Sequence, residues 1–290
     1  MRITDFDLYR DLLKERSGLV LGQDKSYLLD SRLSPIARKW GYPTLDAMTD
    51  ALRGVPDKDL VNDIVEAMTT NETSFFRDNK PFEMFKDVVL KYMKEGRTTR
   101  KELRIWCAAA SSGQEPYSIA MILKEAAAQF PGWRFTIKAT DISDQILNQA
   151  REGVYSQFEV QRGLPIQFLM KYFTQDEEKW RISNDIKAMV NYGNFNLLND
   201  MATLGRFDVI FCRNVLIYFD EKTKASILER MGKQLESDGI LFLGGAETVL
   251  GITDAFKPFP GQRGLYAQPG SVHLAQGGAR GAGNTQQALA

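Results

Sequence analysis

The chain of 290 residues carries 37 basic and 37 acidic side chains, and 43% of its residues are hydrophobic. This length predicts about two domains with a sizeable core, and the zero net charge argues against nucleic acid or an acidic membrane as a general partner. No apolar run approaches the roughly 18 residues of a membrane span, and the N-terminus lacks a signal-peptide core, so we expect a cytoplasmic protein without membrane insertion.

The cysteines and the histidine limit the chemistry that the chain can perform. Cys107 and Cys212 lie in apolar, strand-like runs without a pairing pattern, which predicts buried thiols in a reducing compartment. The single histidine, His273, lies in a stretch without strong structural signals. We therefore expect neither histidine-based catalysis nor a metal site.

Apolar stripes at helical spacing predict an all-helical domain over residues 1–70. The stripes run from Phe6 to Leu13, from Leu28 to Trp40 and from Leu60 to Met68. Between residues 31 and 45 the charged residues are Arg32, Arg38 and Lys39, so one helix presents a basic side. Such a run is typical of a solvated face, and the alternative is a docking surface for an acidic partner.

Residues 71–79 form a predicted linker between this domain and the rest of the chain. The segment combines capping residues from Asn71 to Ser74 with the apolar pair Phe75 and Phe76, followed by Arg77. From these residues alone, the start of a capped helix explains the pattern, because Asn and Thr before an apolar pair need no ligand. A helix is then expected from Lys80 to Lys94.

The stretch from Leu103 to Met121 predicts a strand, a turn of small residues and a helix. In an α/β sheet this junction places backbone N–H groups and a helix N-terminus where ligands bind. Small residues from Ala108 to Gly113 would let a ligand lie close to the backbone, and Glu115 could accept hydrogen bonds from it. The turn lacks the lysine of a Walker loop and the glycines of a dinucleotide fingerprint. An ordinary strand-to-helix connection is the alternative interpretation.

Polar residues follow the ends of the next predicted strands. The second strand ends at Asp141, where an acidic residue accepts hydrogen bonds from ribose hydroxyls in nucleotide-binding α/β folds, although a purely structural aspartate is the alternative. Strands before Asn196 and Asn214 follow, and Tyr218 lies just beyond. Together with Glu115, these residues share one predicted rim. Without a histidine, a metal cluster or a serine nucleophile, they fit a reaction in which a cofactor carries the reactive group.

The remaining pattern predicts an α/β domain over residues 80–268 with an insertion. Residues 153–188 are aromatic, charged and irregular, which predicts an inserted subdomain with a helix and a small antiparallel sheet. The α/β pattern resumes at Met189 and ends with an expected edge strand at residues 264–267. Residues 269–290 are rich in Gly, Ala and Gln, which predicts a disordered tail.

Five collinear motifs resemble those of the CheR-type chemotaxis receptor methyltransferases. They are TTNETSFFR, AAASSGQEPYSIA, ATDIS, NLL and FCRNVLIYF, and the resemblance covers residues 1 to about 268. It implies a class I S-adenosylmethionine-dependent methyltransferase fold, Rossmann-like, after an all-α N-terminal domain. It also implies S-adenosylmethionine as donor, S-adenosylhomocysteine as product, and methyl esterification of glutamate side chains on the cytoplasmic helical bundle of bacterial chemoreceptors.

The resemblance implies roles for particular residues. The implied donor-binding residues are Asn71, Thr73, Arg77, Glu115, Asp141, Asn196, Leu197, Asn214 and Val215. Arg77 and Tyr218 are the implied residues of the reaction itself, and Arg32, Arg38 and Lys39 would meet the receptor bundle. Many members have Glu where this chain has Gln114, which leaves Glu115 in place.

The predicted insertion looks short, as in members that need no pentapeptide tether at the receptor C-terminus, and we expect a monomer. Two other functions are compatible with the same residues. One is a catalytically weak scaffold that binds the donor, and the other is a methyltransferase for receptors of a related signalling pathway.

Overall fold

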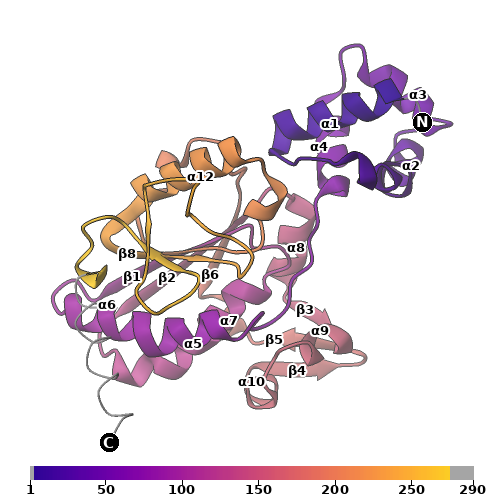
Figure 1. The fold of residues 1–290 in the computed structure, drawn as a ribbon. Helices are drawn as coiled ribbons and strands as arrows, with labels where there is room; N and C mark the ends of the chain where they lie inside the picture. The colour runs from indigo at the N-terminus through magenta and orange to yellow at the C-terminus, as the bar shows by residue number, and fades with distance from the viewer. Residues whose placement is uncertain (1–2, 275–290) are drawn as a thin grey trace, which may run out of the picture. The chain divides into compact units, whose positions relative to one another are not determined.

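The computed structural model describes residues 3–274, which form two compact units (Figure 1). The first unit consists of the chain up to Asn71 together with Tyr218–Thr223, and the second consists of Glu72–Ile217 and the chain from Lys224 onward. The sequence did not indicate that residues 218–223 join the helical unit. They are held there by a hydrogen bond from Val20 N to Tyr218 O of 2.9 Å and by an ion pair between Lys14 and Asp220 of 2.9 Å.

The first unit is all-helical, as predicted. Its helices are α1 (Ile3–Ser17), α2 (Tyr27–Lys39), α3 (Leu45–Leu52) and α4 (Lys58–Met68), with the short 3-10 helix η1 (Gln23–Lys25). Helix α3 was not predicted, although Thr44 caps it by accepting a hydrogen bond from Ala47 N at 3.1 Å. Its apolar face is short, and only Met48 and Leu52 among its large side chains are buried.

The second unit is built on a mixed sheet. Its strands are β1 (Glu102–Ala108), β2 (Arg134–Asp141), β6 (Val190–Asn194), β7 (Phe207–Cys212), β8 (Leu235–Leu243), β9 (Lys257–Pro258) and β10 (Leu265–Ala267). Within residues 3–274 their order is β6-β2-β1-β7-β8-β10-β9, with parallel pairing from β6 to β8 and antiparallel pairing of β10 and β9. The carboxyl ends of β6, β2, β1 and β7 therefore meet at one edge of the sheet.

The prediction that residues 264–267 form the edge strand is wrong, because β9 pairs outside β10. Pro258 lies opposite Tyr266 in that pairing. A proline has no backbone N–H to donate to a further strand, so it suits the outermost position of a sheet. A two-residue strand leaves too short a pattern for sequence analysis to recognise.

Helices cover both faces of the sheet, with α12 on one face and α5, α6 and α7 on the other (Figure 1). The helices and turns are α5 (Lys80–Met84), the π-helix η2 (Phe85–Val89), α6 (Leu90–Gly96), α7 (Gln114–Ala126), η3 (Ala127–Gln129), α8 (Asp144–Glu152), α11 (Asn184–Lys187), η4 (Met201–Leu204), η5 (Leu216–Tyr218) and α12 (Glu221–Gln234). Phe211 of β7 stacks on Phe242 of β8 with ring centroids 4.3 Å apart, and Phe85 meets Phe211 edge to face at 5.6 Å. These fully buried rings join the sheet to the helix that precedes it.

The inserted subdomain contains the predicted small antiparallel sheet, with the two helices α9 and α10 where one helix was predicted. Its elements are β3 (Val154–Ser156), α9 (Gln157–Gln161), α10 (Ile166–Tyr172), β4 (Phe173–Asp176) and β5 (Lys179–Ile182), and among the described residues the strands form an antiparallel sheet in the order β3-β5-β4. Phe75 packs edge to face on Tyr155 at 4.9 Å and on Phe173 at 5.5 Å. The segment after Asn71 is therefore anchored in the core of the insertion.

The predicted disorder from residue 269 is wrong for residues 269–274, while residues 275–290 lie outside the described chain. Ser271 and His273 are buried. His273 Nε2 lies 2.9 Å from the carbonyl oxygen of Asp238, and its ring lies 5.0 Å from that of Tyr92. Burial against these partners orders a segment whose composition alone predicts a tail.

Candidate donor-binding site at the carboxyl edge of the sheet

The turn between β1 and α7 is made of small residues in unusual backbone conformations. Ala109 and Ser111 have φ values of 59° and 50°, and Gly113 has a φ of 92°. A Cβ atom at Gly113 would lie 2.6 Å from Tyr192 Oη, so only glycine fits there. The turn therefore follows a strained path at the sheet edge, which supports a binding function over an ordinary strand-to-helix connection.

Asp141 at the end of β2 is fixed by backbone N–H groups from two segments. Its Oδ2 accepts a hydrogen bond from Ser111 N at 2.9 Å, and its Oδ1 accepts one from Ser143 N at 3.1 Å. The side chain is buried, and Phe195 N at the end of β6 donates to its backbone carbonyl at 2.9 Å. The carboxylate of Asp141 thus lies where the β1 turn, β2 and β6 meet.

Trp106 supports the same edge from within β1. Its side chain is fully buried, and its indole N–H donates to Thr140 Oγ1 at 2.9 Å. The ring also meets Phe195 edge to face at 6.1 Å. It therefore contacts the residues that immediately precede Asp141 and Asn196.

The loop after β6 contains Asn196 and Leu197. Asn196 Oδ1 accepts a hydrogen bond from Leu198 N at 2.9 Å, which folds the loop into a tight turn. Leu197 is buried. Because β6 is parallel to β2, both residues follow the strand end next to Asp141, as the sequence predicted.

Arg213, directly after β7, is the main residue that sequence reasoning missed. Its side chain is only 1% exposed. Nη1 donates to Glu115 Oε2 at 2.8 Å, while Nη2 donates at 2.8 Å both to Asp78 Oδ2 and to the carbonyl oxygen of Arg77. The guanidinium also lies over the ring of Phe82, 5.5 Å from its centroid. Arg213 thus joins the start of α7 to the segment before α5.

The ion pair between Arg213 and Glu115 influences the protonation of Glu115, because Glu115 is buried. Burial raises the pKa of Glu115, and the neighbouring charge and hydrogen bonds of Arg213 oppose that rise. A buried carboxylate without such a partner would tend to take up a proton. The sequence signal that could have indicated Arg213 is its position, since it is a charged residue directly after the apolar run Val209–Cys212.

The segment 72–79 is more than a capped helix start. Phe76, Asp78 and Asn79 have φ values of 48°, 69° and 49°, and Asn79 makes no capping hydrogen bond to α5 through its side chain. Phe76 N donates to Ser118 Oγ of α7 at 3.0 Å, and Arg77 Nη1 donates to the carbonyl oxygen of Glu72 at 2.9 Å. Several non-glycine residues in left-handed conformations mark a segment whose path is imposed by its contacts.

Glu247 was also missed, and it organises the loop that contains Asn214 and Val215. Its Oε2 accepts from Asn214 N at 2.9 Å and from Gly244 N at 2.7 Å, while its Oε1 accepts from Val215 N at 2.9 Å and from Leu216 N at 2.7 Å. Asn214 itself has a φ of 58°. The buried carboxylate therefore holds the loop after β7 against the end of β8.

Most of the predicted site residues belong to the second unit. Those at or near its carboxyl edge are Arg77, Glu115, Asp141, Asn196, Leu197, Asn214 and Val215, while Thr73 belongs to the same unit and its place in the site stays a prediction. Asn71 and Tyr218 belong to the first unit, and their membership of the same site stays a prediction. Cys107 and Cys212 are free and buried, as predicted, and burial raises the pKa of both thiols, so neither is a suitable nucleophile.

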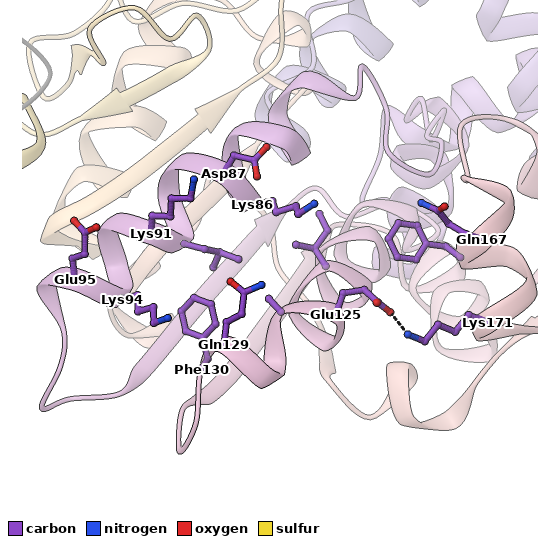
Figure 2. Close-up of a pocket in the computed structure, with 14 residues that line it drawn as sticks. Lys86, Asp87, Lys91, Lys94, Glu95, Glu125, Gln129, Phe130, Gln167 and Lys171 are labelled. Atoms are coloured by element: carbon purple, nitrogen blue, oxygen red, sulfur yellow. Dashed lines mark hydrogen bonds and ion pairs between the residues drawn. The ribbon is translucent and has the colours of Figure 1, made fainter. Parts of the chain in front are cut away.

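A groove lies away from this edge (Figure 2). It has a volume of about 1060 Å³ and lies between η2 and α6, helix α7 and helix α10. Its charged lining residues are Lys86, Asp87, Lys91, Lys94, Glu95, Glu125 and Lys171. Lys171 pairs with Glu125 at 2.6 Å, and the predicted site residues do not line the groove.

The described residues also bear on metals and membranes. In residues 3–274, no cluster of His, Cys, Asp or Glu side chains has the arrangement of a metal site. None of the helices in that range is both long enough and apolar enough to cross a membrane.

Comparison with known proteins adds independent findings. Residues 71–265 match the family model described as CheR methyltransferase, SAM binding domain, and residues 4–69 match CheR methyltransferase, all-alpha domain. Chemotaxis protein methyltransferase Cher2 of Pseudomonas putida is 37% identical over 276 residues, which cover 94% of this chain and 98% of that one. The chemotaxis protein methyltransferase of Vibrio parahaemolyticus is 40% identical over 256 residues, which cover 86% of this chain and 92% of that one.

Proposed function

This chain belongs to the CheR methyltransferase family, and we propose from that premise that it transfers a methyl group from S-adenosylmethionine to glutamate side chains of bacterial chemoreceptors. The family match confirms the resemblance inferred from the motifs. It also confirms the predictions that this chain is a chemotaxis methyltransferase and that its donor is S-adenosylmethionine. That the methyl acceptor is a glutamate side chain is our proposal and goes beyond the family match.

The carboxyl edge of the sheet fits the chemistry of this donor. Glu115 and Asp141 offer carboxylates, which suit an ammonium group and ribose hydroxyls. The β1 turn carries only small side chains at Ala109 and Ser111, both in left-handed conformations, which suits a ligand that lies close to the backbone. When bound, the donor supplies a methyl group on a positively charged sulfur, so a site without a phosphate-binding loop and with acidic side chains is appropriate.

The acceptor chemistry explains why the site needs few proton-transfer groups. A glutamate side chain has a pKa of about 4.3 and is already ionised at neutral pH, so its oxygen can attack without a general base. Orientation is what the protein must provide, and it can contribute up to about 7–11 kcal/mol. Arg77 is the residue that would bind and align the acceptor carboxylate, and Tyr218 would orient the reacting groups.

The observation that carries the proposal is the link between Arg77 and Glu115 through Arg213. Nη1 and Nη2 of one buried guanidinium bind the carboxylate of Glu115 and the backbone carbonyl of Arg77. Burial raises the pKa of Glu115, and the charge of Arg77, like that of Arg213, opposes this rise. The candidate acceptor-binding arginine and the candidate donor-binding carboxylate are therefore held in one cluster.

Methyl transfer from radiolabelled donor to a chemoreceptor tests the proposal directly. We expect label on the receptor as base-labile esters, located at glutamates by mass spectrometry. Arg77→Ala should reduce kcat/KM by at least about 100-fold, since it removes a charge-assisted contact to the acceptor. Arg134→Ala is the control, because Arg134 is 76% exposed and pairs with Glu102 away from the site. Donor binding without any receptor labelling would instead indicate a scaffold.

We further propose that the basic side of α2 contacts the acidic receptor bundle. Arg32 is a poor probe of this surface, because its Nη1 donates to the carbonyl oxygens of Met68 at 3.0 Å and Thr69 at 2.9 Å and so stabilises the end of α4. Lys39 pairs with Asp63 at 2.7 Å. Arg38 is exposed, so Arg38→Glu should raise the KM for receptor without changing donor affinity. An unchanged KM would exclude this surface.

We also propose that methylation does not require a pentapeptide tether on the receptor. The support is the compact insertion, whose β4 and β5 are each four residues long. Removal of the last five residues of the receptor should leave the methylation rate unchanged. A clear drop in rate would show that the insertion binds the receptor C-terminus.

A further inference from the structure

Arg213 is a buried arginine whose guanidinium makes polar contacts with three groups of the protein. Its buried guanidinium contacts residues from two separate segments, namely Glu115 on α7 and the Arg77–Asp78 pair before α5. A buried arginine is costly to desolvate, and a hydrophobic side chain above Phe82 would fill the same space at lower cost. Its polar contacts therefore favour a role in function over a role in packing.

The partners of Arg213 differ in exposure. The side chain of Glu115 is 12% exposed and that of Asp78 is 54% exposed. The contact with Glu115 is therefore the strongly desolvated one, while Asp78 and the carbonyl of Arg77 connect the guanidinium to a segment at the surface. Loss of Arg213 would leave the buried carboxylate of Glu115 without a compensating charge. It would also remove the contacts that hold Asp78 and the carbonyl of Arg77.

We propose that Arg213 is a positioning residue that fixes the carboxylate of Glu115 for a cationic group of the donor and, in the same contact, orders residues 72–79 beside it. The inference rests on the proposed function for the location of the donor. It goes beyond that function because it assigns a role to a residue outside the predicted site. It also predicts coupling, since one guanidinium serves both the donor-binding carboxylate and the segment that carries Arg77.

The electrostatic surroundings of Glu115 give this proposal a measurable signature. The charged and titratable groups that face Glu115 are Arg213, Arg77, Glu247, Cys107 and Cys212. Burial already raises the pKa of Glu115, and Arg213 is the main opposing group. Replacing Arg213 by a neutral residue should raise the pKa of Glu115 further. As the pH is lowered, Glu115 should then take up a proton, and the protein should lose donor affinity, at a higher pH than in the wild type.

Calorimetric titration with S-adenosylmethionine from about pH 5 to pH 9 tests this step. In Arg213→Gln, we expect the pH midpoint of donor affinity to shift upward by about one unit or more relative to wild type. Arg213→Lys keeps the charge without the two-pronged geometry and should give an intermediate shift. Glu115→Gln should bind weakly without this pH dependence, and the double variant should resemble it. An Arg213→Gln midpoint equal to that of wild type would overturn the proposal.

Hydrogen exchange of the backbone tests the ordering of residues 72–79. We expect faster exchange at Phe76 in Arg213→Gln and in Asp78→Asn, but not in Glu115→Gln or in the exposed control Arg134→Gln. Unchanged exchange in Arg213→Gln would show that the segment does not depend on this residue. Both measurements are independent of methyl transfer, so absence of receptor labelling would contradict the proposed function while leaving this inference testable.

Discussion

Among the residues of the second unit that the structure describes, two buried arginines have carboxylate partners, at opposite edges of the same sheet. At the carboxyl edge, Arg213 binds Glu115 and Asp78. At the amino edge, Arg97 at the end of α6 pairs with Asp208 of β7 and Asp238 of β8. The chemistry of the two clusters is the same, but the elements that they join are different.

The difference lies in what each arginine holds. Asp208 is fully buried and also accepts from Arg104 N of β1 at 2.6 Å, and Arg97 Nε donates to Asp238 at 2.9 Å. The amino-edge cluster therefore ties regular elements of the core to one another. Arg213 instead ties a loop, a helix start and an irregular segment, and one of its partners is half exposed. We infer that the first cluster serves stability and the second serves binding.

Replacement of Arg97 should give the largest effect on stability. Arg97→Met leaves the buried carboxylate of Asp208 without its main partner, which should cost about 3–5 kcal/mol of the free energy of unfolding. Urea denaturation measures this loss, and donor affinity of the folded protein should be unchanged. If Arg97→Met greatly weakened donor binding and left stability normal, the inference that the Arg97 cluster serves stability and the Arg213 cluster serves binding would be contradicted.

Replacement of Glu247 should give a smaller loss of stability together with a loss of binding. Glu247→Gln keeps the shape but places an NH2 group among backbone donors, which should cost about 1–3 kcal/mol. Donor affinity should also fall, because Asn214 and Val215 lose their support. The exposed Glu229→Gln on α12 is the matched control for denaturation and calorimetry. Normal donor affinity in Glu247→Gln would show that the loop does not need this carboxylate.

The smallest expected effect concerns pH at the amino edge. Burial lowers the pKa of His273 below its ordinary value, so the folded state favours the neutral ring. As pH falls below about 6.5, the unfolded chain takes up the proton first, and stability is lost. Wild type should therefore lose more stability than His273→Gln between about pH 7 and pH 5. Parallel pH profiles for the two proteins would exclude this contribution.

The sequence predicted those parts of the fold and site that depend on local patterns. Asp141 could be placed because it ends a strand that the sequence predicts, and the β1 turn because its small residues precede a helix. The edge strand β9 and helix α3 were missed because their apolar patterns are too short. Burial of His273 was missed because its partners, Tyr92 and the carbonyl of Asp238, are distant in sequence.

The missed site residues share one physical property. Arg213 and Glu247 act on backbone and side chains of other segments, so their roles appear only when the chain is folded. Arg32 is the opposite case, because the sequence suggested a binding role for it and the fold gives it a structural one. Its charge suggested a surface for a partner, while its guanidinium stabilises the end of α4. Residue type indicates what a side chain can bind, and the fold determines what it does bind.

The position of Trp106 gives the protein a native optical reporter. Its indole is buried, bound to Thr140 and in contact with Phe195, so it lies next to the residues that lead into Asp141 and Asn196. The fluorescence of an indole depends on the polarity and charge around it. The other tryptophans are Trp40, Trp133 and Trp180, and their conversion to phenylalanine would leave a single emission signal from inside the sheet. Occupancy of the carboxyl edge could then be followed in real time without a label.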